Sequence, residues 1–178
     1  WTALAWQMED AAEANIPVVL VIGQKTPRWP ECHYPTWVNR EDPAARKNAL
    51  LDYLKNVGEH YRPNPTLRAW QVENEPFLAF GECPPINAGL VSEEIALVRS
   101  LDTRHEIIVT DGGEFGDWYR AASRADIFGT TIYRKVFNRY FGQMTYPLTP
   151  EYYGLRESIN KWLTGKPDQN YIAIEVGL

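Results

Sequence analysis

Five short apolar segments alternate with segments of helical spacing, and this alternation is the feature that most limits the fold of the chain. Each apolar segment has the length of a β-strand, and no β-hairpin signal separates two of them. Strands with a helix between them run parallel and are joined by right-handed crossovers. The sequence therefore predicts an α/β fold, with strands at 16–23, 68–75, 106–111, 126–133 and 171–176.

The intervals between these strands carry helix signals. Asp42 and Pro43 suit an N-cap and a first helical residue, Thr149 and Pro150 repeat this pattern, and Gly165 suits a C-terminal stop. Helices are expected near 1–11, 42–60, 90–101, 119–124 and 149–164. The chain begins at a tryptophan without an initiator methionine. We therefore expect that residues 1–178 belong to one domain and are a fragment of it.

Two parallel α/β architectures fit this order of elements: an open doubly wound sheet and part of a TIM (β/α)8 barrel. A whole barrel usually needs about 250 residues, so the length of 178 residues by itself favours the open sheet. Polar side chains at the C-terminal strand ends favour the barrel, because there these ends converge on one mouth. We therefore predict a partial TIM barrel, with the polar strand ends at Gln24, Lys25, Asn74, Glu75, Asp111, Glu114, Tyr133 and Glu175.

Charge and motif content exclude several classes of partner. The net charge is −5 and no basic stripe is present, so nucleic acid is not an expected partner. No apolar run reaches the roughly 18 residues of a membrane span. Neither a dinucleotide fingerprint nor metal-ligand spacing of histidine or cysteine occurs. We expect no metal and no other cofactor.

Aromatic residues make up 13% of the chain, with seven tryptophans and ten tyrosines, which is more than a core of this size needs. Such side chains combine an apolar face with a polar edge, which suits carbohydrate. The alternative is that most of them pack helices onto the sheet.

Two glutamates stand where strands end. Glu75 comes just before Pro76, which cannot continue a strand ladder, so its carboxylate is left at the rim. Glu175 ends the last apolar strand. With strict alternation, Glu175 faces the barrel axis together with Tyr171 and Ala173, while the residues between them face the helices.

The Asn74-Glu75-Pro76 motif after one strand, with Tyr133 and then Glu175 ending two later strands, resembles the clan A retaining glycoside hydrolases with a cellulase-like barrel. The resemblance spans essentially the whole chain and aligns its strands with barrel strands three to seven. It implies a retaining β-glycoside hydrolase that acts on an oligo- or polysaccharide. On this resemblance Glu75 is the acid and base, Glu175 the nucleophile, Tyr133 a hydrogen-bond donor to Glu175, and Asn74 a ligand of the sugar 2-hydroxyl.

One difficulty lies in the strand before Pro76. Strict alternation sends Glu73 inward with Glu75 and turns Asn74 away. A bulge at the strand end would resolve this conflict. Otherwise Glu73 is the inward rival of Glu75, and a buried carboxylate there needs a partner such as an arginine.

Further candidates line the expected mouth of the barrel. Trp29 and Trp118 are candidate stacking platforms for sugar or, alternatively, packing residues, and Glu114 is a candidate third carboxylate of the site. Lesser candidates are Glu31, His33, Trp37 and Asp111.

Cys32 and Cys83 follow consecutive strands, so they can form a disulfide in an oxidising compartment, the extracellular space or cell envelope, or remain two free thiols. Competing readings of function are a barrel that binds carbohydrate without cleaving it, an inactive truncated fragment, and a doubly wound hydrolase. The last lacks a nucleophile-elbow motif.

Overall fold

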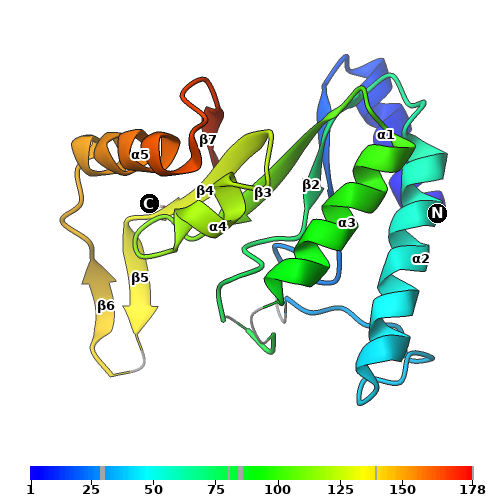
Figure 1. The fold of residues 1–178 in the computed structure, drawn as a ribbon, viewed down its shortest axis with the longest axis horizontal. Coiled ribbons are helices and arrows are strands. Elements are labelled where there is room, and N and C mark those ends of the chain that lie inside the picture. Colours follow the sequence, from blue (N-terminus) through cyan, green and yellow to red (C-terminus); the bar gives the residue numbers. More distant parts are fainter. Residues whose placement is uncertain (29–30, 80, 84–85, 139, 178) are drawn as a thin grey trace.

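The computed structural model describes residues 1–28, 31–79, 81–83, 86–138 and 140–177. Five parallel strands form one curled sheet in the order β1-β2-β3-β4-β7 (Figure 1). The strands are β1 (Val18–Ile22), β2 (Leu67–Val72), β3 (Glu106–Asp111), β4 (Ile127–Tyr133) and β7 (Asn170–Gly177). The helices are α1 (Thr2–Glu13), α2 (Pro43–Tyr61), α3 (Ala88–Leu101), α4 (Trp118–Ala122) and α5 (Pro150–Thr164).

The strand order decides between the two predicted architectures. Along the chain, each strand of this sheet lies next to the previous one, so the strand order never reverses. A doubly wound sheet has a reversal of strand order, whereas a barrel has none. The partial TIM barrel is therefore confirmed, and β1 and β7 are the outer strands of this sheet.

The two faces of the sheet bury different sets of residues. On the helix side, alternate strand residues such as Trp70 and Val72 belong to the main core, together with Leu54 of α2 and Val98 of α3. The opposite face holds a small apolar cluster of Ala69, Ile108 and Ile127, with Ile172 and Ile174 packed on it. This second cluster fills the concave side of the curled sheet, as side chains fill the interior of a barrel.

The helix ends follow the sequence signals closely. The Asp42 side chain accepts hydrogen bonds from the first backbone amides of α2, which satisfies donors that have no partner within the helix. Gly165 ends α5 in the left-handed conformation, at a φ of 66°. Thr149 occupies the N-cap position of α5, although its side chain makes no capping hydrogen bond.

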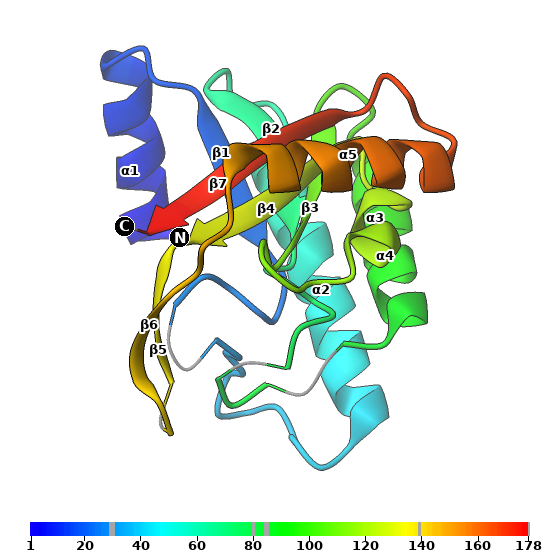
Figure 2. The ribbon, with the colours of Figure 1, turned by 90° about the vertical axis from the view of Figure 1, so that its left-hand side faces the viewer.

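A β-hairpin interrupts the expected alternation. Strands β5 (Lys135–Asn138) and β6 (Gly142–Thr145) pair antiparallel between β4 and α5, so the prediction that no hairpin occurs is wrong here. These strands are four residues each, and they lack the two-residue Asn-Gly type of turn that identifies a hairpin in a sequence. In both views the hairpin extends to the same side as the loops that follow β1 and β2 (Figures 1 and 2).

Within the described ranges, none of the helices has the length and apolar character needed to cross a membrane.

Candidate active site

Strand β2 ends before its glutamates. Its last residue is Val72, and Glu73 and Glu75 adopt left-handed backbone conformations with φ of 62° and 44°. This geometry breaks the two-residue alternation of the strand, so Asn74 and Glu75 both reach the concave side. The predicted conflict between Glu73 and Glu75 is therefore resolved by a left-handed strand end.

Glu75 lies in a buried position on the concave side, with 8% of its surface exposed. Its backbone amide donates to Thr110 Oγ1 at 2.8 Å, and its Oε1 accepts from Thr131 Oγ1 at 2.8 Å. Burial raises the pKa of Glu75, the Thr131 hydrogen bond and the Lys25 charge oppose this, and the charge of Glu175 adds to it. Burial is thus the largest cause of the raised pKa of Glu75, ahead of the neighbouring carboxylate of Glu175.

A bulge in β7 turns Glu175 to the same side. Thr130 pairs with Ala173 and Thr131 pairs with Glu175, so Ile174 is an extra residue in the ladder. Ile172 and Ile174 pack on the concave face, whereas Tyr171 packs on the helix side against Phe128.

The predicted facing of Tyr171 and Ala173 toward the axis is therefore wrong. Glu175 nevertheless pairs with Thr131, whose hydroxyl contacts Glu75. The extra residue shifts the alternation by one position, so the inward facing of Glu175 follows from the bulge.

Tyr133 connects the end of β4 to Glu175. Its hydroxyl donates to Glu175 Oε2 at 2.7 Å, which confirms the predicted hydrogen bond. This bond to a carboxylate is the first cause that raises the pKa of Tyr133 to about 12, followed by burial, so the phenol keeps its proton over the ordinary pH range. The two glutamates are thus linked to neighbouring positions of one strand, since Glu75 contacts Thr131 and Glu175 contacts Tyr133.

Sequence reasoning missed Thr131. The signal for it was present, because Thr131 lies two residues before Tyr133 on the same strand and so on the same face.

Asn74 is 2% exposed and is held by protein groups. Its Oδ1 accepts from Gln71 Nε2 at 3.1 Å and from Thr110 Oγ1 at 3.3 Å. Its side chain also hydrogen-bonds Glu31, the loop residue whose pKa burial raises. Asn74 therefore ties the β1 loop to the ends of β2 and β3, and its contact with a sugar hydroxyl stays a prediction.

Glu73 points away from the concave side and is fully buried. Its carboxylate accepts from the backbone amides of Gln24, at 2.9 Å, and Lys25, at 2.7 Å. A Cβ atom on Gly23 would stand 2.5 Å from the Glu73 carboxyl carbon, so only glycine fits there. Glu73 anchors the loop after β1, and the arginine partner expected for it is replaced by backbone amides.

A second buried carboxyl group, Glu94 of α3, interacts with Glu73. Burial is the main cause that raises the pKa of Glu94 to about 10, and the charge of Glu73 adds to it. Burial likewise raises the pKa of Glu73, to about 7. Glu94 therefore carries a proton at neutral pH, which avoids two charges in one buried space.

A disulfide joins the loops after β1 and β2. Cys32 and Cys83 are bonded with a Cα–Cα distance of 5.4 Å. Cys32 also pairs with Lys25 in an antiparallel bridge, so the cross-link lies next to the loop start that Glu73 anchors. Of the two alternatives that the sequence left open, the structure has the disulfide.

Trp118 does not suit its predicted role as a sugar platform. It is 2% exposed, packs against Phe128, and donates through Nε1 to the carbonyl of Gly112 at 2.9 Å. The guanidinium of Arg156 lies over its ring, 4.2 Å from the ring centre. Trp118 is a core residue, because it is buried and its ring and its polar edge both contact other groups of the protein.

Glu114 is also used internally. Its Oε1 accepts from the backbone amide of Tyr133 at 2.8 Å and from the Tyr153 hydroxyl at 3.2 Å. Glu114 is 8% exposed and supports Tyr133 through the backbone amide of that residue, and its role as a third carboxylate of the site stays a prediction. Trp29, the other predicted platform, lies outside the described residues.

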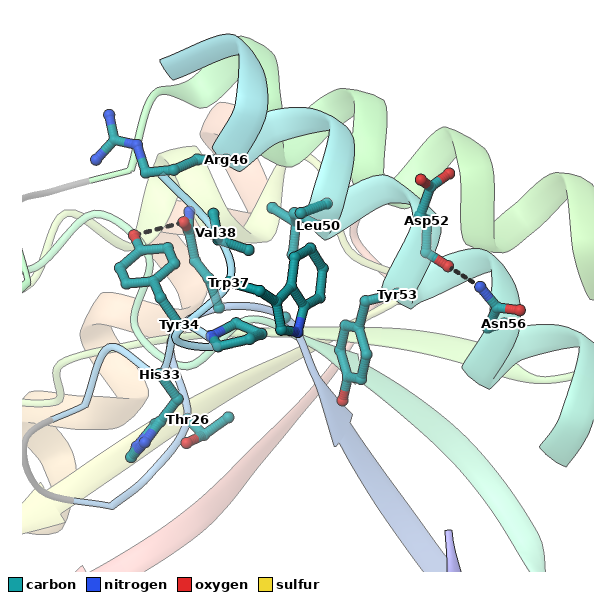
Figure 3. Close-up of a pocket in the computed structure, with 14 residues that line it drawn as sticks. Thr26, His33, Tyr34, Trp37, Val38, Arg46, Leu50, Asp52, Tyr53 and Asn56 are labelled. Atoms are coloured by element: carbon teal, nitrogen blue, oxygen red, sulfur yellow. Dashed lines mark hydrogen bonds between the residues drawn. The ribbon is translucent and has the colours of Figure 1, made fainter. Parts of the chain in front are cut away.

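A separate pocket of about 470 Å³ lies between the loop after β1 and helix α2 (Figure 3). Its walls are mainly apolar and aromatic, and the lesser candidates His33 and Trp37 are part of them. The Tyr34 hydroxyl donates to Gln24 Oε1 at 2.7 Å at one end of the pocket. Neither Glu75 nor Glu175 lines it.

Metal ligands do not gather in the part of the chain that the structure describes, where no group of three or more histidine, cysteine, aspartate or glutamate side chains could hold an ion.

Comparison with solved structures shows what this fold is similar to. The endo-β-1,4-mannanase from Thermotoga petrophila aligns over 98% of this chain and 45% of its own, with a TM-score of 0.61 and 18% identity. The β-galactosidase from the Antarctic haloarchaeon Halorubrum lacusprofundi aligns over 98% of this chain and 39% of its own, with a TM-score of 0.62 and 15% identity.

Xylanase A from P. fluorescens subsp. cellulosa aligns over 74% of this chain and 45% of its own, with a TM-score of 0.54 and 15% identity. No protein-family model and no curated protein matches the sequence. The chain spans less than half the length of these three solved chains. These likenesses show the fold: the chain has the architecture of part of a (β/α)8 barrel, as the resemblance to the clan A hydrolases implied.

Proposed function

We propose that this chain is part of the catalytic domain of a retaining β-glycoside hydrolase, with Glu175 as nucleophile and Glu75 as acid and base. The observation that carries the proposal is the convergence of these glutamates on one strand end, Glu75 through Thr131 and Glu175 through Tyr133. The double-displacement mechanism in general requires two carboxyl groups about 5 to 5.5 Å apart.

In the first step, the Glu175 carboxylate attacks the anomeric carbon and forms a covalent glycosyl ester. The bond to the leaving oxygen breaks, and the protonated Glu75 carboxyl donates its proton to that oxygen. In the second step, the Glu75 carboxylate takes a proton from water, and the water oxygen displaces Glu175 from the anomeric carbon. Glu75 suits both the acid and the base role, because burial raises the pKa of its carboxyl group.

Tyr133 supports the nucleophile in this scheme. Its hydroxyl directs one oxygen of Glu175 and leaves the other for attack. Asn74 is the proposed contact of the sugar 2-hydroxyl, a bond that strengthens as the ring approaches the oxocarbenium-like transition state. The proposed substrate is an oligo- or polysaccharide.

A second candidate is that the chain alone is an inactive portion of such an enzyme, or binds carbohydrate without cleaving it. In the described part of the chain β1 and β7 each pair with one strand only, which favours the inactive portion, because a barrel closes by pairing its outer strands. The test therefore uses the longer protein that contains this chain.

The deciding experiment combines kinetics with covalent trapping. Glu175→Gln should reduce turnover of aryl β-glycosides to background, and Glu75→Gln should lose about 10² to 10⁴-fold on substrates with poor leaving groups and much less on activated ones. A slow 2-fluoro glycoside should add one sugar to the peptide that holds Glu175. Wild-type turnover by Glu175→Gln, or a product of inverted configuration, would exclude the proposed mechanism.

A further inference from the structure

Lys25, the third residue after β1, is fully buried and contacts the segment that carries Glu75. Its ammonium group donates to the carbonyl of Glu75 at 2.9 Å and to the carbonyl of Leu78 at 2.8 Å. Its backbone amide donates to Glu73 Oε2 at 2.7 Å, and its carbonyl accepts from the Asn74 amide at 3.0 Å. One residue thus binds the segment 73–78 through both its side chain and its backbone.

This segment needs such support because of its backbone conformation. Glu73 and Glu75 have φ of 62° and 44°, and both are non-glycine residues. A left-handed conformation costs such a residue about 1 to 2 kcal/mol, so it persists only where the surroundings determine it. The turn is also what brings Glu75 to the concave side, next to Thr131.

The charge of Lys25 acts on the same place. Burial lowers the pKa of Lys25, and the carboxylates that face it oppose this, in the order Glu31, Glu75, Glu73 and Asp111. In return, the Lys25 charge lowers the pKa of Glu75, together with the Thr131 hydrogen bond and against burial, Glu175 and Glu31. If this cation is lost, the carboxylates around Glu75 still raise its pKa, and no other cation among the described residues lowers the pKa as much as Lys25 does.

We propose that Lys25 is a positioning residue for Glu75: its buried ammonium group holds the left-handed turn that aims the Glu75 carboxyl at the glycosidic oxygen and supplies the positive charge beneath it. This inference rests on the proposed function of Glu75 as the acid. Lys25 itself touches no substrate, since it is buried and both hydrogen bonds of its ammonium group go to backbone carbonyls.

The chain offers a matched control. Lys166 also directs its ammonium group to backbone carbonyls, those of Ala122, Ser123 and Ala125, at 3.1, 2.9 and 2.9 Å. These carbonyls belong to the end of α4 and the turn that precedes β4, whereas the two glutamates contact Thr131 and Tyr133 at the other end of β4. Lys166→Met therefore removes the same chemistry from a place without a catalytic role.

The experiment compares Lys25→Met and Lys166→Met in the longer protein by thermal unfolding and by pH–rate profiles on aryl β-glycosides. Both variants should unfold at lower temperature. Lys25→Met should also lose about 10²-fold in kcat, the typical effect of a misplaced catalytic group. Its alkaline limb of kcat/KM should move to higher pH, because loss of the cation raises the pKa of Glu75. Lys166→Met should keep the wild-type limb.

Two outcomes overturn the inference: an alkaline limb that stays in place in Lys25→Met, or a loss of kcat no larger than that of Lys166→Met. If Lys25→Met does not fold, Lys25→Gln keeps a donor for the two carbonyls, removes the charge, and carries the same pH test.

A second readout separates this inference from the proposed function. Absence of glycoside turnover in the wild-type protein refutes the proposed function alone. Carbon NMR titration of labelled glutamate, with Glu75→Gln to assign the signal, then decides the role of Lys25 directly. A higher pKa for Glu75 in Lys25→Met supports the inference, and an unchanged one overturns it.

Discussion

The hydroxyl of Tyr133 donates a 2.7 Å hydrogen bond to Oε2 of Glu175, which joins the ends of two neighbouring parallel strands, β4 and β7. The Glu114 carboxylate supports this contact by accepting from the Tyr133 amide at 2.8 Å. The direction of the Glu175 carboxylate therefore depends on a side chain of β4 and a carboxylate from the loop after β3.

Tyr133→Phe tests this contact. A hydrogen bond to a charged group contributes about 1.5 to 3 kcal/mol, so we expect kcat of the longer protein on aryl β-glycosides to fall roughly 10- to 100-fold. Tyr34→Phe is the matched control, since it removes a hydroxyl that donates to Gln24 at the same 2.7 Å. A kcat for Tyr133→Phe equal to that of Tyr34→Phe would show that the contact does not serve catalysis.

Glu94 makes stability depend on pH. Its pKa rises from 4.5 to about 10 in the folded chain, so the folded state holds a proton that the unfolded state releases. The stabilisation is complete below the unfolded pKa and is lost as pH rises through the folded pKa. We therefore expect the chain to be less stable at pH 8 than at pH 5 through this group.

Glu94→Gln should remove this dependence, because an amide resembles the protonated carboxyl in shape and does not titrate. Denaturant unfolding should show the variant more stable than wild type at pH 8 and close to it at pH 5. Glu93→Gln, which changes a half-exposed partner of Lys47, is the control. A wild-type slope of stability against pH in Glu94→Gln would contradict the buried proton.

The Cys32–Cys83 disulfide should contribute to stability and to order in the loops after β1 and β2. Replacing both cysteines by serine should lower the free energy of unfolding by about 2 to 4 kcal/mol, the usual range for a natural cross-link. Denaturant unfolding with and without reductant measures this. Equal midpoints in the two conditions would mean that the cross-link does not restrain the unfolded chain.

Trp118→Ala distinguishes a core residue from a sugar platform. A buried tryptophan lost from a core costs about 3 to 5 kcal/mol, so thermal unfolding should move to much lower temperature. Trp37→Ala is the control, because Trp37 is 75% exposed and surface changes usually stay within about 0.5 kcal/mol. Unchanged stability with a raised KM in Trp118→Ala would restore the platform role.

Much of the fold could be read from local pattern. The apolar segments and the helix signals at Asp42 and Gly165 predicted the elements, because they express backbone preferences and burial that act within a few residues. The polar residues at strand ends pointed to the barrel, because only converging strands make such residues neighbours. The hairpin at 135–145 was not predicted, because its short strands are not joined by a turn with a distinctive sequence.

The site depended on departures from that pattern. Of the two alternatives left open for the end of β2, the structure has an irregular strand end, where left-handed residues turn Glu73 away. The expectation that Tyr171 faces the axis is wrong, because the extra residue Ile174 shifts the alternation in β7. Such shifts are set by contacts with distant residues, as the bonds of Lys25 to Glu75 and Leu78 illustrate. The two residues of such a contact lie far apart in the chain, so no short stretch of sequence contains both of them.

Residue type and period were therefore enough to predict the parallel α/β order, and the resemblance to the clan A hydrolases predicted the two glutamates and the tyrosine that joins one of them. The three-dimensional structure was needed to show which way each side chain points, that Trp118 packs in the core, and that the cysteines are joined. The physical reason is that direction and burial follow from packing between strands far apart in the chain, which local preference does not encode.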